Sequence, residues 1–256
     1  MTISVITVAY NSAATIGYTL DSVARQIHSD VEHLVIDGAS DDKTVEVAKA
    51  RGTERVRLIS EPDSGIYDAM NKGFRLANRE IIGFLNADDM FADDQVLSRV
   101  TAAFEDPAIE VCFGDLLYVT EDNQSVVRFW RSRPFVPGSF ARGWSPAHPT
   151  FYIRRSALER LGGFDLSYRL AADTEFMMRY LERGELRAAY IPHVQVRMRV
   201  GGVTNRSLRN IFRQNQEVLR ALKKNEVSYS LFSFALHKLA NRFWQRWTGF
   251  KYKDSA

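Results

Sequence analysis

The chain has 256 residues, of which 45% are hydrophobic and 25% are charged, with only 7 prolines. This composition excludes disordered, collagen-like and low-complexity proteins, and it allows one domain, or two joined closely, around a substantial core. The formal net charge of +3 is unevenly distributed, because residues 206–256 hold 11 lysines and arginines against 3 acidic residues. The chain therefore combines an acidic body with a basic C-terminal segment, which is expected to meet anionic partners.

The single cysteine and the absence of long apolar stretches bear on where the protein works. Cys112 lies in an apolar stretch, so no intrachain disulfide can form and a zinc site built on cysteines is excluded. The first residues show no basic leader, and no stretch approaches the roughly 20 apolar residues that span a bilayer. These features predict a protein of a reducing, cytoplasmic compartment that is neither secreted nor integral to a membrane.

Four β-branched or apolar runs in the first 105 residues predict strands. They cover residues 3–9, 33–36, 56–59 and 81–85, and a helical pattern follows each of the first three. Strands that recur at roughly 25–30 residues with helices between them indicate right-handed βαβ units. The predicted fold class is therefore α/β, with a Rossmann-like, mainly parallel sheet flanked by helices.

The rest of the chain is less regular. Residues 107–205 form a long connecting region with prolines at 134, 137, 146 and 149, followed by a helical pattern through Phe176 and Leu181. Between Leu231 and Trp247, apolar residues occupy one helical face and basic or polar residues the other, which predicts an amphipathic helix. Its apolar face is expected either to insert into an anionic membrane surface or to pack on the catalytic domain or on another subunit.

Polar residues follow each of the four predicted strands. Ligands of open α/β sheets collect at the carboxyl ends of the strands, so these residues are candidates for a site. They are Tyr10 and Asn11, then Asp37-Gly38-Ala39-Ser40-Asp41, then Glu61-Pro62-Asp63-Ser64-Gly65, and finally Asn86-Ala87-Asp88-Asp89.

Asp88 and Asp89 are candidate metal ligands. Adjacent carboxylates supply the hard oxygen ligands that suit Mg²⁺ or Mn²⁺, and these ions leave coordination positions open for phosphate oxygens. Acidic residues before the next helix would also complement its dipole without any metal. The acids at the neighbouring strand ends favour the metal interpretation.

The second and third strand ends also allow two interpretations. Asp37 either caps a turn or hydrogen-bonds a base or ribose. The Asp63-Ser64-Gly65 turn opens a helix, where backbone N–H groups can meet anionic oxygens. Lys72 lies a little over two helical turns beyond Ser64, so it either points back to that site or lies on the surface.

Asp173, Glu175 and His148 are the candidates in the second half of the chain. The two acids open a helix, as dipole complementarity alone would favour, but a carboxylate at the mouth of a pocket can also serve as general base for a hydroxyl. His148, in Pro146-Ala147-His148-Pro149, is a candidate for proton transfer or substrate contact, although a lone histidine is more often structural.

The order and spacing of four segments resemble the family 2 glycosyltransferases with the GT-A fold, particularly the soluble enzymes of bacterial surface-polysaccharide assembly. The segments are residues 4–11, 36–44, 61–73 and 83–89. The resemblance covers approximately residues 1–205, and it implies a donor half of about 1–105 and an acceptor half of about 106–205. Residues 206–256 are then a basic C-terminal helical extension.

The resemblance implies inverting transfer of a sugar from a nucleoside diphosphate, UDP or GDP being favoured, to a hydroxyl of a saccharide that is expected to be lipid-linked. A divalent cation, Mn²⁺ or Mg²⁺, would assist. The resemblance further assigns the nucleoside contacts to Tyr10, Asn11 and Asp37, places Asp63 and Lys72 near the donor, gives the metal and diphosphate to Asp88 and Asp89, and makes Asp173 the base. His148 and Glu175 would lie on the acceptor side. Asn86 departs from the usual Asp-x-Asp pattern, so Asp88 is the preferred ligand.

The chemistry suits these residue types. Cleavage of the anomeric bond leaves charge on the diphosphate, which a divalent cation stabilises, and the acceptor hydroxyl needs a base on the opposite side of the sugar. Processive synthases carry Gln-x-x-Arg-Trp, a spacing that Gln245-Arg246-Trp247 lacks. The sequence therefore predicts addition of single sugars.

Other functions fit less well. The first turn lacks Gly-x-Gly-x-x-Gly and no Walker P-loop occurs, so dinucleotide oxidoreductases and ATPases are disfavoured. The alternative is a non-catalytic GT-A domain that binds nucleotide or saccharide, or serves as a scaffold. The combination of Asp88, Asp89 and Asp173 favours an enzyme, since a binding module needs no base. Nucleic acid is not expected as a partner, because the aromatics of the basic segment follow an apolar helical stripe.

Overall fold

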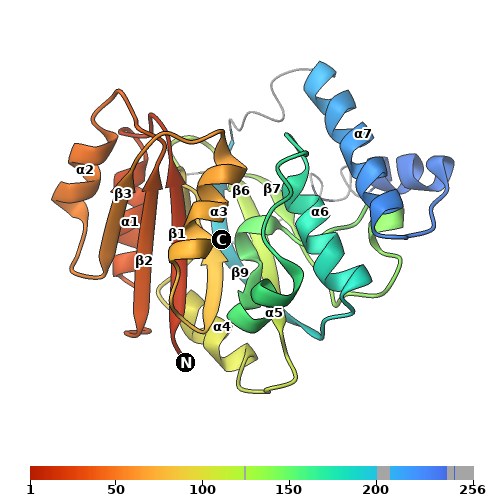
Figure 1. The fold of residues 1–256 in the computed structure, drawn as a ribbon, viewed down its shortest axis with the longest axis horizontal. Coiled ribbons are helices and arrows are strands. Elements are labelled where there is room, and N and C mark those ends of the chain that lie inside the picture. Colours follow the sequence, from red (N-terminus) through yellow and green to blue (C-terminus); the bar gives the residue numbers. More distant parts are fainter. Residues whose placement is uncertain (124, 201–207, 241–244, 246–256) are drawn as a thin grey trace.

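The computed structural model describes residues 1–123, 125–200, 208–240 and 245. In these residues, nine strands form one sheet that has helices on both faces (Figure 1). The strands are β1 (Ile3–Ala9), β2 (Val31–Asp37), β3 (Val56–Ser60), β4 (Ile81–Phe84), β5 (Asp89–Phe91), β6 (Val111–Val119), β7 (Val126–Trp130), β8 (Tyr152–Arg154) and β9 (Ala188–Arg199).

Seven longer helices and three short helical turns accompany the strands in the described residues. They are α1 (Ile16–Ala24), α2 (Thr44–Arg51), α3 (Ile66–Leu76), α4 (Val96–Ala103), α5 (Arg155–Leu161), α6 (Ala172–Met178), α7 (Leu208–Lys224), η1 (Phe140–Arg142), η2 (His148–Thr150) and η3 (Arg179–Arg183). Residues 231–240 are also helical.

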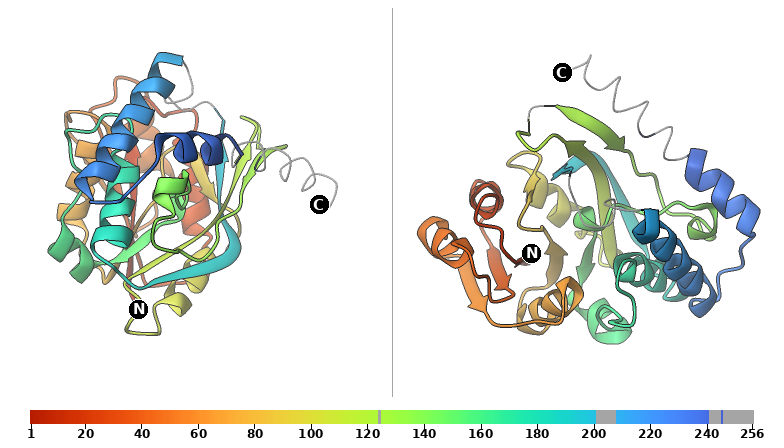
Figure 2. Two further views of the ribbon diagram at one scale, coloured as in Figure 1. Left: turned by 90° about the vertical axis from the view of Figure 1, so that its right-hand side faces the viewer. Right: turned by 90° about the horizontal axis from the view of Figure 1, so that it is seen from above.

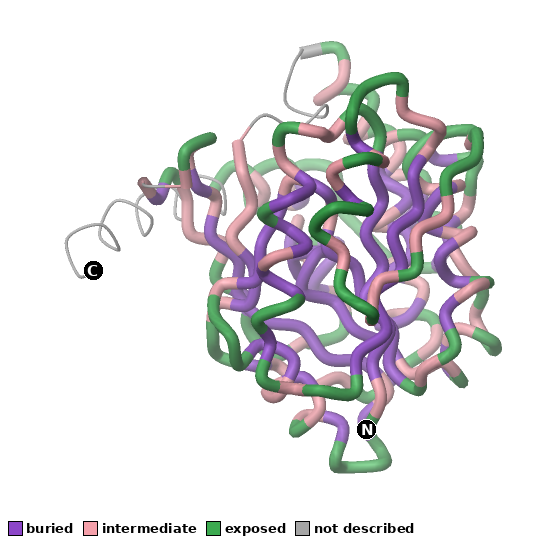
Figure 3. Tube along the Cα trace, turned by 90° about the vertical axis from the view of Figure 1, so that its left-hand side faces the viewer, coloured by how far each residue is buried: buried purple, intermediate pink, exposed green. Residues whose placement is uncertain are grey.

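The N-terminal half is the predicted parallel sheet. Its strands stand in the order β3-β2-β1-β4, and all three pairings are parallel. Every residue of β1 and β2 is buried, and Figure 3 shows buried segments at the centre of the molecule with exposed loops around them. Helices that cover both faces of a parallel sheet explain why the strands read as unbroken apolar runs. The α/β prediction is confirmed for this half.

The C-terminal half is a mixed sheet, and its strands are absent from the sequence-based prediction. β8 pairs antiparallel with β4 and β6, whereas β6 and β9 run parallel over nine register pairs. The register shifts from Gly114 opposite Ile191 to Asp115 opposite Val194, which leaves a bulge at Pro192 and His193. The bulge accommodates the proline but breaks the alternation by which a strand is recognised.

A cluster of aromatic rings joins the two halves. Phe164 lies between Phe74 of α3 and Phe176 of α6, with ring centroids 5.4 and 4.6 Å away, and Phe84 of β4 lies 5.5 Å from it. Close aromatic pairs of this kind add to the free energy gained by burial. The cluster fixes α6, and with it Asp173, against the parallel sheet.

The described part of the C-terminal extension packs on this core. Val218, Ala221 and Leu222 of α7 are buried in the same cluster as the sheet residues. The boundary at residue 206 stays a prediction, and it lies outside the described residues. Figure 2 shows helix 231–240 beside the segment that contains η1. This helix makes contact through buried Phe234.

Gly143, which follows η1, permits the approach of helix 231–240. Its φ is +64°, and a Cβ there would lie 3.1 Å from the backbone nitrogen of Lys238. The predicted apolar stripe faces elsewhere, since Phe232, Leu236 and Leu239 are 78, 55 and 70% exposed. The prediction that this stripe packs on the catalytic domain is therefore wrong for the described residues, whereas packing on another subunit stays a prediction. Phe243 and Trp247, the last members of the predicted stripe, lie outside the described residues.

None of the described helices has both the length and the apolar character needed to cross a membrane.

Candidate active site

The loops after β1 and β2 bind each other at the carboxyl edge of the sheet. Asn11 donates its backbone N–H to Ser40 Oγ at 2.9 Å, and its own Oδ1 accepts the N–H of Asp41 at 3.0 Å. Asn11 and Ala39 both have positive φ, 49° and 59°. Asparagine tolerates this conformation, whereas alanine is strained in it, and such strain is concentrated at functional loops.

Asp37 organises the second of these loops from a fully buried position. Its carboxylate accepts hydrogen bonds from the backbone N–H and hydroxyl of Ser40 and from the hydroxyl of Ser60 at 2.6 Å. Asp37 thus holds the ends of β2 and β3 together. A direct contact between Asp37 and a nucleoside stays a prediction.

Tyr10, Gly38 and Asp63 meet above this loop. A Cβ on Gly38 would lie 2.5 Å from Asp63 Oδ2 and 3.4 Å from Tyr10 Cδ2, so a larger residue would have to displace the Asp63 carboxylate. Tyr10 is 62% exposed, and Asp63 accepts the N–H of Gly65 at 2.8 Å. An exposed aromatic face beside a carboxylate offers stacking and hydrogen bonding to a planar ligand.

Lys72 points back from α3 toward the end of β3, in agreement with one of the two interpretations of the sequence. Its Nζ donates to the carbonyl oxygen of Pro62 at 2.6 Å and pairs with Glu61 at 3.0 Å. The ammonium group therefore lies next to the Asp63 turn.

Asn86, Asp88 and Asp89 follow β4. Asp88 is half-buried, whereas Asp89 begins β5 and is fully buried. Burial raises the pKa of Asp88, and burial next to Asp88 raises the pKa of Asp89 well above its usual range. Asn86 Nδ2 donates to Asp89 Oδ2 at 3.3 Å, but Asp89 Oδ1 and Asn86 Oδ1 are buried without a partner. Orphaned buried oxygens at a strand end suit a cation.

Asp173 occupies the first turn of α6. Its Oδ1 accepts the backbone N–H of Thr174 at 2.8 Å and the hydroxyl of Tyr67 at 3.4 Å. The burial of Tyr67 and the charge of Asp173 raise the pKa of this tyrosine well above its ordinary value, so it stays a donor. These contacts fix the carboxylate through one oxygen, and in the described residues no hydrogen bond reaches the other, Oδ2.

His148 stands opposite Asp173, in η2. The imidazole packs between Phe84 and Phe164 at centroid distances of 5.5 and 5.6 Å, and its Nε2 is buried without a partner. Burial lowers the pKa of His148, and the charge of Asp173 opposes this shift. The histidine is therefore neutral at pH 7 and offers one ring nitrogen to a ligand.

Glu175 does not join the other predicted acceptor-side residues. Its fully buried carboxylate pairs with Arg179 at 3.2 Å and with Lys224 at 3.0 Å. The helical period turns it away from Asp173, two residues earlier on the same helix. Glu175 therefore ties α6 to α7, and we do not retain the acceptor-side assignment.

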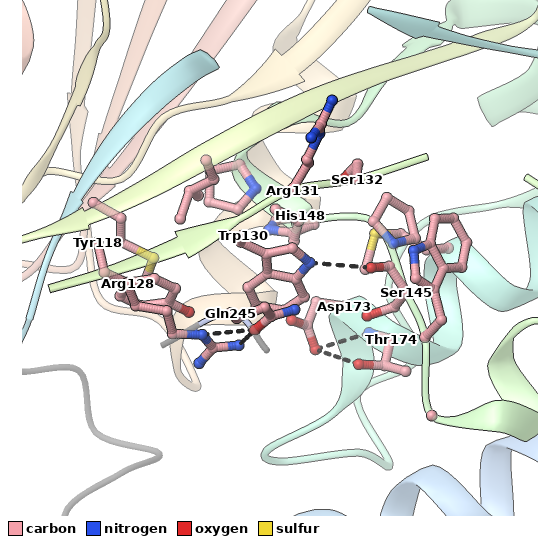
Figure 4. Close-up of a pocket in the computed structure, with 18 of the residues that line it drawn as sticks. Tyr118, Arg128, Trp130, Arg131, Ser132, Ser145, His148, Asp173, Thr174 and Gln245 are labelled. Carbon is pink, nitrogen blue, oxygen red and sulfur yellow. Dashed lines mark hydrogen bonds between the residues drawn. The ribbon is translucent and has the colours of Figure 1, made fainter. Parts of the chain in front are cut away.

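A pocket of about 600 Å³ lies between the end of β4 and the candidate residues of the second half of the chain (Figure 4). Asn86, His148 and Asp173 all line it. The pocket therefore extends from the Asp88 strand end to the candidate base. The predicted nucleoside residues Tyr10, Asn11, Asp37, Asp63 and Lys72 do not line this pocket, and neither do Asp88 and Asp89 themselves.

Several residues that line the pocket are not identified by the sequence reasoning. β7 contributes Arg128 and Trp130, the following loop contributes Arg131, and the C-terminal segment contributes Lys238 and Gln245. β7 itself is missed, and only the pairing of distant segments brings these side chains together. The basic, aromatic run from Arg128 to Arg133 is the one signal in the sequence that marks them.

Comparison with known proteins identifies the family. Residues 4–164 match the model of glycosyl transferase family 2. The chain belongs to this family. The glycosyltransferase is 31% identical, over 79% of its length and 78% of the relative, to the PGL/p-HBAD biosynthesis glycosyltransferase of Mycobacterium tuberculosis. It is 26% identical to the glycosyltransferase EpsJ of Bacillus subtilis, over 72% of its own length and 57% of EpsJ.

Solved structures confirm the GT-A fold of this glycosyltransferase. The structure of S. aureus TarS, residues 1–349 in complex with UDP-GlcNAc, superposes with a TM-score of 0.65 and 20% sequence identity. The match covers 99% of this chain and 76% of the TarS chain. The mannosyltransferase PcManGT of Pyrobaculum calidifontis, in complex with GDP-Man and Mn²⁺, superposes with a TM-score of 0.65 and 21% sequence identity. The match covers 99% of this chain and 75% of the PcManGT chain.

Proposed function

We propose that this glycosyltransferase transfers a sugar, with inversion, from a nucleoside diphosphate to a hydroxyl of a saccharide acceptor in bacterial surface polysaccharide synthesis. Asp173 carries the proposal, because it lines the same pocket as Asn86 of the Asp88 strand end. Inversion needs a base on the face of the sugar opposite the leaving diphosphate. A binding module without turnover would have no use for a carboxylate positioned in this way.

Asp173 would take the proton of the acceptor hydroxyl. Tyr67 and Thr174 hold its Oδ1, so Oδ2 is the oxygen that would accept the proton. His148, with an unpartnered buried Nε2, would accept or donate a hydrogen bond to the acceptor sugar and so orient the hydroxyl. Orientation of this kind contributes substantially to enzymatic rates.

Asp88 and Asp89 would hold a divalent cation, Mn²⁺ or Mg²⁺. The residues fit such an ion. Asp89 Oδ1 is buried without a partner, and the pKa values of both carboxyl groups are raised, so a bound cation would stabilise their charged forms. The described residues contain no cluster of three or more His, Cys, Asp or Glu side chains that would hold a metal. Donor phosphate oxygens and water would then complete the coordination. The ion, when bound, stabilises the charge on the leaving diphosphate.

The Tyr10–Asp63 region would bind the nucleoside. The exposed ring of Tyr10, the Asp63 carboxylate and Lys72 lie at the ends of β1 and β3, and Asp37 shapes the loop between them. TarS with UDP-GlcNAc and PcManGT with GDP-Man show that this fold accepts uridine and guanosine donors. We therefore propose a UDP- or GDP-sugar.

We further propose a lipid-linked acceptor and work at the inner face of the cytoplasmic membrane. The exposed stripe of Phe232, Leu236 and Leu239 lies on a helix within the basic C-terminal segment. An apolar stripe on a basic helix is typical of attachment to an anionic lipid surface. Such attachment would bring the pocket, lined by Phe234 of the same helix, to acceptors in the membrane.

Nucleotide binding tests the donor proposal. We expect a uridine or guanosine diphosphate, with Mn²⁺, to raise the melting temperature of the full chain more than thymidine or cytidine diphosphate, because ligands of the native state stabilise it. The Asp88→Asn variant should lose the part of the shift that requires Mn²⁺, whereas Asp93→Asn, outside the site, should keep it. If every nucleotide leaves the melting temperature unchanged, a non-catalytic scaffold is the better account.

A further inference from the structure

The pocket next to Asp173 is strongly basic. Five of the described residues that line it are cationic, and Asp173 is the only carboxylate in this set. The cationic residues are Arg128, Arg131, Arg133, Arg199 and Lys238. A cavity walled by one sign of charge raises the local concentration of ligands of the opposite sign.

Three of these cations have defined tasks within the protein. Arg128 lies between Tyr118 and Trp130, 4.9 Å from each ring, and donates to Gln245. Lys238 donates to Asn215 at 2.6 Å and thereby fastens helix 231–240 to α7. Arg199 lies near Asp88, where its charge acts on the metal side of the site.

Arg131 and Arg133 are the remaining two cations of this set, and both are exposed. Arg133 lies 5.2 Å over the ring of Trp144. Burial raises the pKa of Asp115 and the nearby charge of Arg131 opposes this shift, but the carboxylate also accepts the N–H of Ser132 at 2.7 Å and the hydroxyl of Tyr190 at 2.9 Å. Asp115 therefore offsets only part of the positive charge of the pair.

Two tryptophans line the pocket between the arginines. Trp130 Nε1 donates to the carbonyl oxygen of Ser145 at 3.3 Å, whereas Trp144 Nε1 is buried without a partner. Aromatic faces with polar edges pair an apolar surface with a donor, which suits the alternating CH and OH groups of a sugar ring. The pocket thus combines surfaces for a saccharide with cations for an anion.

We propose that the acceptor carries a carboxylate or phosphate close to the sugar that is attacked, and that Arg131 and Arg133 bind this anion. The proposal rests on the proposed function, and it names the class of acceptor for the same site. Guanidinium groups match carboxylate and phosphate oxygens through paired hydrogen bonds. The negative group would belong to an acidic sugar or to the phosphate of a lipid carrier.

Binding of three small molecules to the full chain tests the proposal, with the donor region saturated by UDP and Mn²⁺. The molecules are methyl β-glucuronide, the neutral methyl β-glucoside and geranyl diphosphate. We expect at least one anionic molecule to bind about tenfold or more tightly than the glucoside. Preference for the glucuronide would indicate an acidic sugar, and preference for the diphosphate a lipid carrier.

The double variant Arg131→Gln/Arg133→Gln should lose this preference while it keeps the nucleotide-dependent thermal shift. The matched control is Arg25→Gln/Arg57→Gln, which removes two exposed arginines that do not line the pocket, and it should keep the preference. Equal binding of neutral and anionic molecules, binding of none of them, or an equal loss in both variants would overturn the proposal. If the nucleotide shift is absent but the preference is present, the donor proposal fails and the anion site stands.

Discussion

His33 gives the parallel sheet a pH dependence that belongs to a single residue. The side chain is buried in β2, where its Nε2 lies 2.9 Å from Thr7 Oγ1, and burial lowers its pKa to about 4. The unfolded chain takes up this proton near pH 6.5, but the folded chain does so only near pH 4. The unfolded state therefore binds more protons in between, and stability falls as the pH drops from about 6.5 to 4.

The His33→Asn variant tests this prediction. Between pH 7.5 and pH 5, we expect the free energy of unfolding of the variant to fall by about 2 kcal/mol less than that of the wild type. The control is His28→Asn, which alters a histidine that is only half-buried. Urea unfolding at both pH values provides the measurement. An unchanged pH dependence in His33→Asn would contradict the assignment.

Residues at the ends of the regular βαβ units are the ones that sequence patterns locate. Tyr10, Asp63 and Asp88 are found in this way, because strand ends meet at one edge of a parallel sheet. Glu175 is misplaced, because a helix start attracts acids for several reasons and only packing shows which way each one points. Sequence patterns equally provide no sign that Asp37 is buried beneath its own loop.

At the scale of elements, α7 positions the helix that bears Asp173. Glu217 of α7 accepts the backbone N–H groups of Arg169, Leu170 and Ala171 at 2.8 to 3.1 Å, immediately before α6. These N–H groups have no partner within the helix itself, and a carboxylate there also complements the helix dipole. Glu217 is thus a positioning residue for the helix that bears the proposed base.

We expect Glu217→Gln to lower the free energy of unfolding by about 1–3 kcal/mol and kcat by about tenfold, because an amide has one acceptor oxygen for three donors. The KM for the donor should stay the same, since the nucleoside residues lie elsewhere. The control is Glu159→Gln, an exposed residue of α5. Steady-state kinetics and urea unfolding test both parts. Normal kcat with normal stability would exclude the positioning role.

The elements that the sequence failed to predict are those that pair at long range. β6 and β9 are joined across more than 60 residues, and the bulge at Pro192 hides their alternation. The βαβ units, in contrast, are built from neighbouring segments, and local patterns suffice to recognise them. This difference explains why the parallel sheet of the N-terminal half is predicted well and the pocket wall from β7 is not.

At the scale of the molecule, the exposed stripe on helix 231–240 is expected to bind membranes. Phe232→Ser/Leu239→Ser should reduce flotation of the full chain with liposomes that contain anionic lipid, because each change removes an exposed apolar group from the interface. Helix 231–240 should keep its place, since Phe234 and Lys238 are untouched. Ile27→Ser/Leu166→Ser, which alters apolar residues that are 63 and 52% exposed elsewhere, is the control. Equal flotation of both variants would exclude the stripe as the membrane contact.

Asp173 is proposed to be the base of the sugar transfer, and a comparison of three proteins tests this role. Release of UDP or GDP from the matching nucleotide sugar, in the presence of acceptor, is measured for the wild type, for Asp173→Asn and for the control Asp165→Asn. Asp165 lies in the same region but pairs with Lys224. We predict that Asp173→Asn slows acceptor-dependent release by about 10²–10⁴-fold, with donor affinity unchanged, and that Asp165→Asn does not. Transfer at the wild-type rate by Asp173→Asn would contradict the account.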